Sequence, residues 1–259
     1  MAVPKNVYGA KVGKLKAWVL STLYWICWGG VLGVFHVAQV LALHLLGEPA
    51  RRRVADVLNG ALLLCLRILA IRPRLEVQAW PPQGRPLIVV ANHQNPVDIS
   101  GISWLLRAYQ PAFVAKQELA RSLPSVSYNL RHSGAALIDR KDARQSLREI
   151  ARLGRLIAEE KRAAVIFPEG TRAKDGQMKA FAGAGVKTLL KNAPDALLVP
   201  ICIDGAWRMN ATGLFPLCLG HDICWRLMPA IDPAQEGGAD AALEKAERAI
   251  RSALSTSRT

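Results

Sequence analysis

The stretch LIVVANHQNPVD, residues 87–98, decides how this chain folds. Its first five residues are apolar, as in a short strand that is buried on both faces of a sheet. A polar loop follows at once, and Asn95-Pro96 is typical of the cap and first residue of a helix. The stretch therefore predicts a buried strand, a loop, and a helix that begins at the carboxyl end of the strand.

Similar apolar runs recur along the chain between helical patterns. Strands are expected at residues 112–115, 135–138, 163–167 and 196–203, and helices at 142–160, 178–191 and 239–254. Asp142 is the expected cap of the first of these helices, whose core face is predicted to hold Leu147, Ile150, Leu153 and Ile157. This alternation predicts an α/β domain with a central sheet, mostly parallel or mixed, that is flanked by helices.

The N-terminal part has the composition of a membrane segment. Residues 17–47 contain no Asp, Glu, Lys or Arg, and as one straight helix they would reach about 46 Å, against a hydrocarbon core of about 30 Å. Gly29-Gly30 and Gly33 lie near the middle, and basic residues flank both ends. These features favour a re-entrant helical hairpin with both flanks on the cytoplasmic side, and one steeply tilted span is the alternative.

A second apolar segment, residues 54–71, is interrupted by polar residues, which is typical of an amphipathic helix lying on a membrane or against a domain. Pro73 ends it. We therefore expect a membrane-associated helical segment over residues 1–72 and a second domain over residues 73–259.

Charge and cysteine content narrow the class of protein further. The formal net charge is +14, which indicates an anionic partner: nucleic acid, an anionic membrane surface or an acidic carrier protein. The five cysteines include no CxxC pair, so we expect free thiols in a reducing compartment and no zinc site. No nucleic-acid readout motif is present, and the apolar N-terminal part favours the membrane among these partners.

His93 and Asp98 lie in the loop and at the helix start that follow the first buried strand. A neutral histidine can take the proton of an attacking hydroxyl, while a carboxylate on its other ring nitrogen fixes the tautomer and stabilises the imidazolium. A capping aspartate beside a loop histidine is the structural alternative. The pair is therefore a candidate catalytic dyad that needs support from other motifs.

That support comes from FPEGTR, residues 167–172, which follows another predicted strand. A carboxylate, a glycine and an arginine leave the sheet together here, at the edge where α/β folds bind ligands. Glycine lets the backbone approach a ligand, and arginine can hold a phosphate with two hydrogen bonds. Lys116 and Arg140 also follow predicted strands, so both are candidates to bind the same phosphate. A solvent-exposed side chain without a ligand is the default interpretation of each.

Taken in order, these elements resemble the glycerolipid acyltransferase family that includes the 1-acylglycerol-3-phosphate acyltransferases. NHxxxxD is matched by Asn92, His93 and Asp98. KxEL is matched at residues 116–119, G…IDR at 134–140 and FPEGTR at all six positions, and the proline-containing last strand is similar to residues 199–203.

The resemblance implies transfer of a fatty acyl group from acyl-CoA or acyl carrier protein to the sn-2 hydroxyl of lysophosphatidic acid. It implies no cofactor and no metal, a place at the anionic leaflet of a bacterial inner membrane, and a catalytic domain on the cytoplasmic face. His93 and Asp98 would be catalytic, and the substrate-binding residues would be Lys116, Arg140, Glu169, Gly170, Thr171 and Arg172, with Glu169 orienting either the glycerol or Arg172.

One departure concerns the acceptor. The family often has Phe-Lys-x-Gly after FPEGTR, whereas this chain has Phe181-Ala182-Gly183, with Lys179 two residues before the phenylalanine. The alternatives are that Lys179 reaches the site from another angle or that the acceptor is another lysolipid, such as a lyso-ornithine lipid. A non-catalytic lipid-binding protein and a membrane-associated nucleic-acid binder are the alternatives from other classes.

Overall fold

The structure is a computed structural model of the chain, and it describes residues 10–256. Within that range the chain forms one seven-stranded sheet in the order β1-β7-β6-β2-β5-β3-β4. Neighbouring strands are parallel except β6 and β7, which are antiparallel. The expected α/β class with a mixed sheet is confirmed. The strands are β1 (Arg72–Val77), β2 (Leu87–Ala91), β3 (Ala112–Lys116), β4 (Ala136–Ile138), β5 (Ala163–Ile166), β6 (Leu197–Asp204) and β7 (Asp222–Leu227).

Two strands, β1 and β7, were not predicted from apolar runs in the sequence. β1 is an edge strand that remains largely accessible to solvent, and charged residues make up half of its sequence RPRLEV. In β7 buried residues alternate with partly exposed ones. Only strands buried on both faces give continuous apolar runs, so the pattern that located the centre of the sheet could not locate these two.

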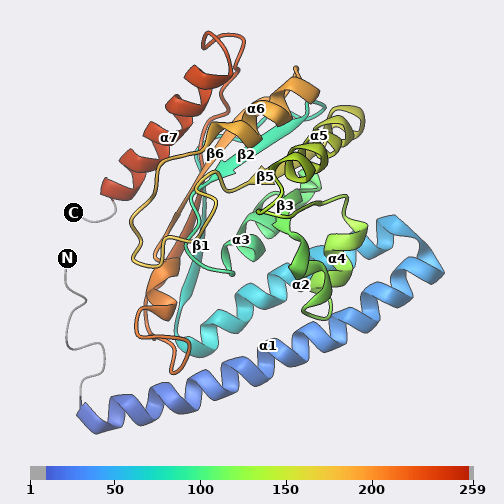
Figure 1. The fold of residues 1–259 in the computed structure, drawn as a ribbon. Coiled ribbons are helices and arrows are strands. Elements are labelled where there is room, and N and C mark those ends of the chain that lie inside the picture. The colour runs from blue at the N-terminus through green and yellow to red at the C-terminus, as the bar shows by residue number, and fades with distance from the viewer. Residues whose placement is uncertain (1–9, 257–259) are drawn as a thin grey trace.

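Helices cover both faces of the sheet (Figure 1). α1, α2 and α3 lie on one face, where apolar residues such as Leu87 and Val89 meet Leu63 and Ile102. α5, α6 and α7 cover the other face, which Ile88 and Val90 help to form. The helices are α1 (Ala10–Leu46), α2 (Glu48–Cys65), α3 (Asp98–Leu105), α4 (Val126–His132), α5 (Ala143–Glu160), α6 (Gly183–Asn192) and α7 (Ala239–Thr256), with short 3-10 helices η1 (Leu66–Leu69), η2 (Arg107–Tyr109), η3 (Gln117–Arg121) and η4 (Ala206–Asn210).

The expected reversal of the chain at Gly29-Gly30 is wrong. α1 is one continuous helix of 37 residues, about 55 Å long, and it runs through Gly29, Gly30 and Gly33. A glycine inside a helix costs about 1 kcal/mol relative to alanine, which weakens a helix without ending it. The chain turns instead at Gly47, whose φ of 81° favours glycine. α2 then returns beside α1, so the chain reverses after the apolar run and not within it.

α1 contains the one stretch among the described residues that is long and apolar enough to cross a membrane, Gly13–Leu46. Length and composition alone define this candidate span. Its most apolar 18-residue window is only 17% buried within the protein, so most of its apolar surface has no protein partner. Lys5, one of the expected flanking cations, lies outside the described residues.

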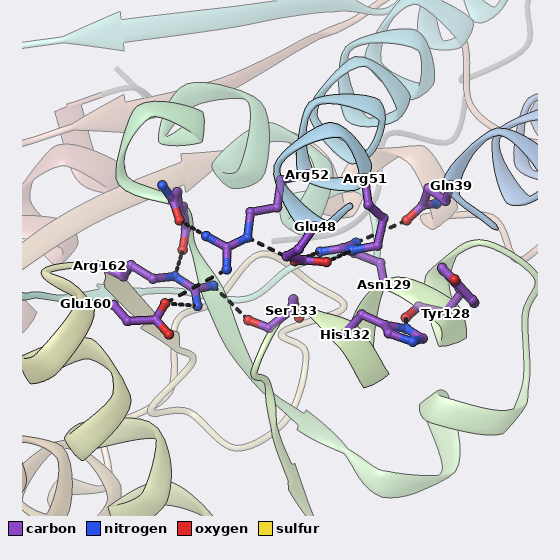
Figure 2. Close-up of polar contacts among 11 residues, drawn as sticks. Gln39, Glu48, Arg51, Arg52, Tyr128, Asn129, His132, Ser133, Glu160 and Arg162 are labelled. Atoms are coloured by element: carbon purple, nitrogen blue, oxygen red, sulfur yellow. Dashed lines mark hydrogen bonds and ion pairs between the residues drawn. The ribbon is translucent and has the colours of Figure 1, made fainter. Parts of the chain in front are cut away.

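A buried polar cluster joins the α1–α2 turn to α4 (Figure 2). Arg51 is 1% exposed and donates two hydrogen bonds to the Glu48 carboxylate, at 2.6 and 2.7 Å. It also donates to the side-chain oxygens of Asn129 at 2.7 Å and Gln39 at 3.4 Å. Because α4 lies in the crossover between β3 and β4, this cluster ties the N-terminal helices to the segment that leads into β4.

Two of the predicted helices differ from expectation, one in its core face and one in its start. Asp142 caps α5, as expected, by accepting a hydrogen bond from the Gln145 backbone N–H at 2.9 Å. However, Leu147 is 41% exposed and does not join the core face of that helix. Residues 178–182 are not helical, because the Lys179 N–H bonds to the Glu169 side chain and the Phe181 N–H bonds to the Glu247 side chain, and α6 begins only at Gly183.

Candidate active site

The His93 ring and the Asp98 carboxylate lie in direct contact. His93 Nδ1 is 2.8 Å from Asp98 Oδ2. The same oxygen accepts hydrogen bonds from the backbone N–H groups of Gln94 at 2.6 Å and Asn95 at 2.8 Å. Asp98 is fully buried, whereas the His93 side chain is 15% exposed. The aspartate therefore holds Nδ1 of the ring and leaves Nε2 as the nitrogen available to a substrate.

The local fold that makes this contact differs slightly from expectation. α3 begins at Asp98, two residues later than the Asn95-Pro96 signal predicts. The Asn95 side chain accepts a hydrogen bond from the Val97 N–H at 3.2 Å and so closes a turn before the helix. That turn brings residue 98 back to residue 93.

Asparagines hold the loop against the sheet, a role that the sequence analysis did not assign. Asn92 makes two hydrogen bonds with the Ile203 backbone in β6, at 2.7 and 2.8 Å. Asn95 Nδ2 donates to the Ala206 carbonyl and to the Asn210 side chain. The motif match at Asn92 was the available signal, but its partner lies 111 residues away in sequence, beyond the reach of any local pattern.

Glu169 of FPEGTR connects the second motif to the first. One carboxylate oxygen accepts the His93 backbone N–H at 2.7 Å, and the other accepts the Lys179 N–H at 2.8 Å. Burial raises the pKa of Glu169, and the two hydrogen bonds oppose that rise. Both oxygens are thus engaged by backbone groups, and no hydrogen bond or ion pair joins Glu169 to Arg172 within the described chain.

The remainder of FPEGTR shapes the wall and rim of the site. The Phe167 ring stacks on the His93 ring, with 4.1 Å between centroids. Gly170 has a φ of 68°, a backbone conformation that would be strained for a residue with a side chain. Thr171 accepts a hydrogen bond from Lys179 Nζ at 2.6 Å. The Lys179 side chain therefore contacts the FPEGTR loop.

The three candidate phosphate ligands follow three adjacent strands. Lys116 ends β3 and pairs with Ile138 of β4, two residues before Arg140, while Arg172 follows β5. All three side chains are exposed, and none forms an ion pair with another described residue. Because β2, β5, β3 and β4 are parallel neighbours about 4.8 Å apart, the cations share the carboxyl edge of the sheet with His93.

Asp139, which precedes Arg140, makes its hydrogen bonds with residues that follow it in the chain. Its carboxylate accepts the Lys141 backbone N–H at 2.9 Å, and its own N–H bonds to Gln145. Asp139 thus shapes the turn before α5. Within residues 10–256, no group of three or more His, Cys, Asp or Glu side chains is placed to hold a metal ion.

Comparisons with known proteins agree with this geometry. The Acyltransferase family model matches residues 74–204, about half of the chain. A 1-acyl-sn-glycerol-3-phosphate acyltransferase of Chlamydomonas reinhardtii is 27% identical over 174 residues, which are 67% of this chain and 50% of that protein. One from Helicobacter pylori is 36% identical over 93 residues, which are 35% of this chain and 37% of that protein. The chain spans about half the length of several curated relatives that it matches.

A solved structure shares the fold. The crystal structure of the 1-acyl-sn-glycerophosphate (LPA) acyltransferase PlsC from Thermotoga maritima has a TM-score of 0.76, and the match covers 95% of this chain and 98% of that one. At 20% sequence identity this likeness shows the architecture alone. The NHxxxxD and FPEGTR motifs lie together at one sheet edge. The family model covers both motifs, and this chain belongs to the Acyltransferase family.

Proposed function

We propose that this protein transfers a fatty acyl group from an acyl thioester to the free sn-2 hydroxyl of 1-acylglycerol 3-phosphate and so forms phosphatidic acid. The proposal is supported by the relatives of this chain, which carry the name 1-acyl-sn-glycerol-3-phosphate acyltransferase. The observation that carries it is the 2.8 Å contact between His93 and Asp98, with cations on the adjacent strand ends.

In the proposed reaction His93 is the general base. Its Nε2 takes the proton of the acceptor hydroxyl as that oxygen attacks the thioester carbonyl. Asp98 keeps the proton of the free ring on Nδ1 and stabilises the imidazolium. When the tetrahedral intermediate collapses, the carbon–sulfur bond breaks, the ester bond remains, and the imidazolium returns its proton to the departing thiolate. A thioester is already activated, so the scheme needs no covalent acyl-enzyme.

The acceptor phosphate is assigned to the cations at the sheet edge. Arg172 can hold it bidentately, with Lys116 and Arg140 as further charges. The open space beside Gly170 leaves the backbone of the FPEGTR loop accessible to the acceptor. Thr171 and Lys179 form the rim next to it. Glu169 acts through the backbone of His93 in this scheme and does not need to touch the lipid.

The proposed location is the membrane surface, with the catalytic domain on the cytoplasmic face. The exposed apolar side of α1 includes Trp18, Ile26, Val34 and Leu45, and it has the character of a lipid-contacting surface. Basic residues at both ends of the apolar run favour anionic lipids. Acceptor and product are lipids, so a site held at the membrane needs only partial extraction of either one.

The test is acyl transfer by detergent-purified protein. Labelled acyl-CoA and acyl carrier protein are offered as donors, lysophosphatidic acid and lyso-ornithine lipid as acceptors, and His93→Ala is compared with the exposed His44→Ala. Phosphatidic acid formed by wild type and by His44→Ala, but not by His93→Ala, supports the proposal. Transfer only to lyso-ornithine lipid would mean that this lipid, and not lysophosphatidic acid, is the acceptor. No transfer from either donor by folded protein would contradict enzymatic function and favour a lipid-binding role.

A further inference from the structure

The outward side of α5 carries a row of cations without acidic partners. Arg144, Arg148 and Arg155 are exposed, and Lys141 precedes the helix. Residues four apart lie on one side of a helix. Arg144 and Arg148 form neither an ion pair nor a hydrogen bond with any other described residue, and Arg155 donates only to the Asn192 side chain, at 3.1 Å. These cations are therefore free to meet an anionic partner.

The neighbouring arginine of α5 shows the contrast. Arg152 is bound to Glu149 at 3.0 Å, and it also donates to the carbonyl oxygens of Gly134 and Ala135. It thus serves the packing of α5 on the chain before β4. Arg144 and Arg148 have no such contact with other described residues, which leaves their positive charge without an explanation inside the domain.

An apolar side chain lies within this row. Leu147 is 41% exposed, although the helical pattern predicts it in the core, and it lies between Arg144 and Arg148 in sequence. Arginines beside an exposed apolar side chain are typical of protein interfaces, where arginine is enriched and lysine is depleted. An exposed leucine would contribute little to the binding of a small phosphate, so the apolar side chain favours a protein partner.

The position of α5 decides which kind of partner can reach it. α5 packs on the face of the sheet opposite to α1, α2 and α3, as Figure 1 shows. Its outward side therefore faces away from the apolar surface of α1, and the membrane that covers α1 does not cover it. At the same time α5 begins three residues after Arg140, at the carboxyl edge that holds His93. A partner on this surface is soluble, anionic and next to the active site.

We propose that Arg144, Leu147 and Arg148 form a docking surface for the acidic carrier protein that presents the acyl thioester. The inference rests on the proposed function and names the donor for it. Three strand spacings, about 14 Å, separate β4 from β2 along the edge, a span that a carrier-bound acyl group bridges with its long flexible arm. Complementary charge raises the rate of such an encounter and makes it sensitive to salt.

The kinetic test compares the two donors. The double variant Arg144→Glu/Arg148→Glu is assayed with acyl carrier protein and with acyl-CoA, beside Lys245→Glu/Arg248→Glu on α7, which makes the same change of net charge elsewhere. The docking surface predicts that the α7 variant keeps its kcat/KM. The α5 variant should lose kcat/KM, and this loss should be at least tenfold larger with the carrier donor than with acyl-CoA. Equal losses with both donors, no loss with either, or use of acyl-CoA alone by the wild type would overturn the inference.

A binding measurement separates this inference from the proposed function. Fluorescently labelled carrier protein without an acyl group is titrated with the full-length chain in detergent. A fluorescently labelled duplex DNA is the second probe. Binding at least tenfold weaker in the α5 variant than in the α7 variant supports docking even if no acyl transfer is found. Binding that is absent, equal in both variants, or weaker than binding to DNA would overturn it.

Discussion

The carboxylate of Glu169 accepts a hydrogen bond from the backbone N–H of His93 at 2.7 Å, so the ends of two adjacent strands, β2 and β5, are joined directly beside the candidate base. The other carboxylate oxygen binds the Lys179 N–H. Together with the Ala173 N–H, which donates to the His93 carbonyl at 2.7 Å, Glu169 holds the His93 backbone against the FPEGTR loop.

Glu169→Gln should destabilise the protein and displace His93. A glutamine has one acceptor oxygen for two inward-pointing N–H groups, so one of them loses its partner, at about 1–3 kcal/mol. We expect a lower Tm in detergent together with a lower kcat. Glu244→Gln, which changes a glutamate of an exposed ion pair on α7, should leave both values nearly unchanged. An unaltered Tm in Glu169→Gln would show that the two hydrogen bonds contribute little.

Asp98→Asn isolates the charge of the dyad. Oδ2 receives the contacts from Gln94, Asn95 and His93, whereas the buried Oδ1 has no hydrogen-bond partner among the described residues. The asparagine oxygen can therefore take the place of Oδ2 and preserve the loop, so the main loss is the negative charge that stabilises the imidazolium. We expect kcat to fall about 100-fold while KM for the acceptor changes less than threefold.

The measurement for Asp98→Asn is steady-state kinetics with circular dichroism as the check on folding. A kcat within threefold of wild type in a folded variant would mean that the reaction does not depend on the Asp98 charge. A large rise in KM with unchanged kcat would instead place the residue in acceptor binding.

Arg51→Ala should be strongly destabilising, and Arg52→Ala is its matched control. Both arginines bind Glu48, but Arg51 is 1% exposed and Arg52 is 32% exposed. Removal of the buried partner also leaves Asn129 and Gln39 without a donor and costs about 3 kcal/mol, whereas the exposed pair contributes about 0–1 kcal/mol. Thermal unfolding in detergent compares the two variants, and equal losses would contradict the role of burial.

His221 should make stability depend on pH. Burial, followed by the nearby charge of Arg208, lowers the pKa of His221 from 6.5 to about 4. Between these values the unfolded chain binds the proton more readily than the folded one, so stability is fully present above pH 6.5 and is lost as the pH falls towards 4. The loss is at most about 3 kcal/mol.

His221→Gln removes that titration, so its Tm should decline less than that of wild type between pH 7 and pH 5. The comparison of slopes is informative even if the substitution lowers Tm at both pH values. Parallel curves for the two proteins would show that other groups cause the acid sensitivity.

Much of the fold was predictable because its centre is regular. Continuous apolar runs located β2, β3, β4, β5 and β6, and the capping signal at Asp142 located the start of α5. The same logic failed where burial is one-sided or absent, as in β1 and β7, and at Leu147, which follows the periodicity of the core but is 41% exposed. A periodic pattern cannot reveal whether another element covers a given face.

The sequence by itself determined the family, through the order of its motifs, and the strand–loop–helix around residues 87–98, which depends on residues close together in the chain; it also made His93 and Asp98 a candidate pair. The tertiary structure alone decided the turn at Gly47, the attachment of Asn92 to Ile203, the backbone partners of Glu169, and the position of α5 on the face opposite α1. Each of these depends on packing or hydrogen bonds, and most on groups distant in sequence, so only the folded chain reveals them.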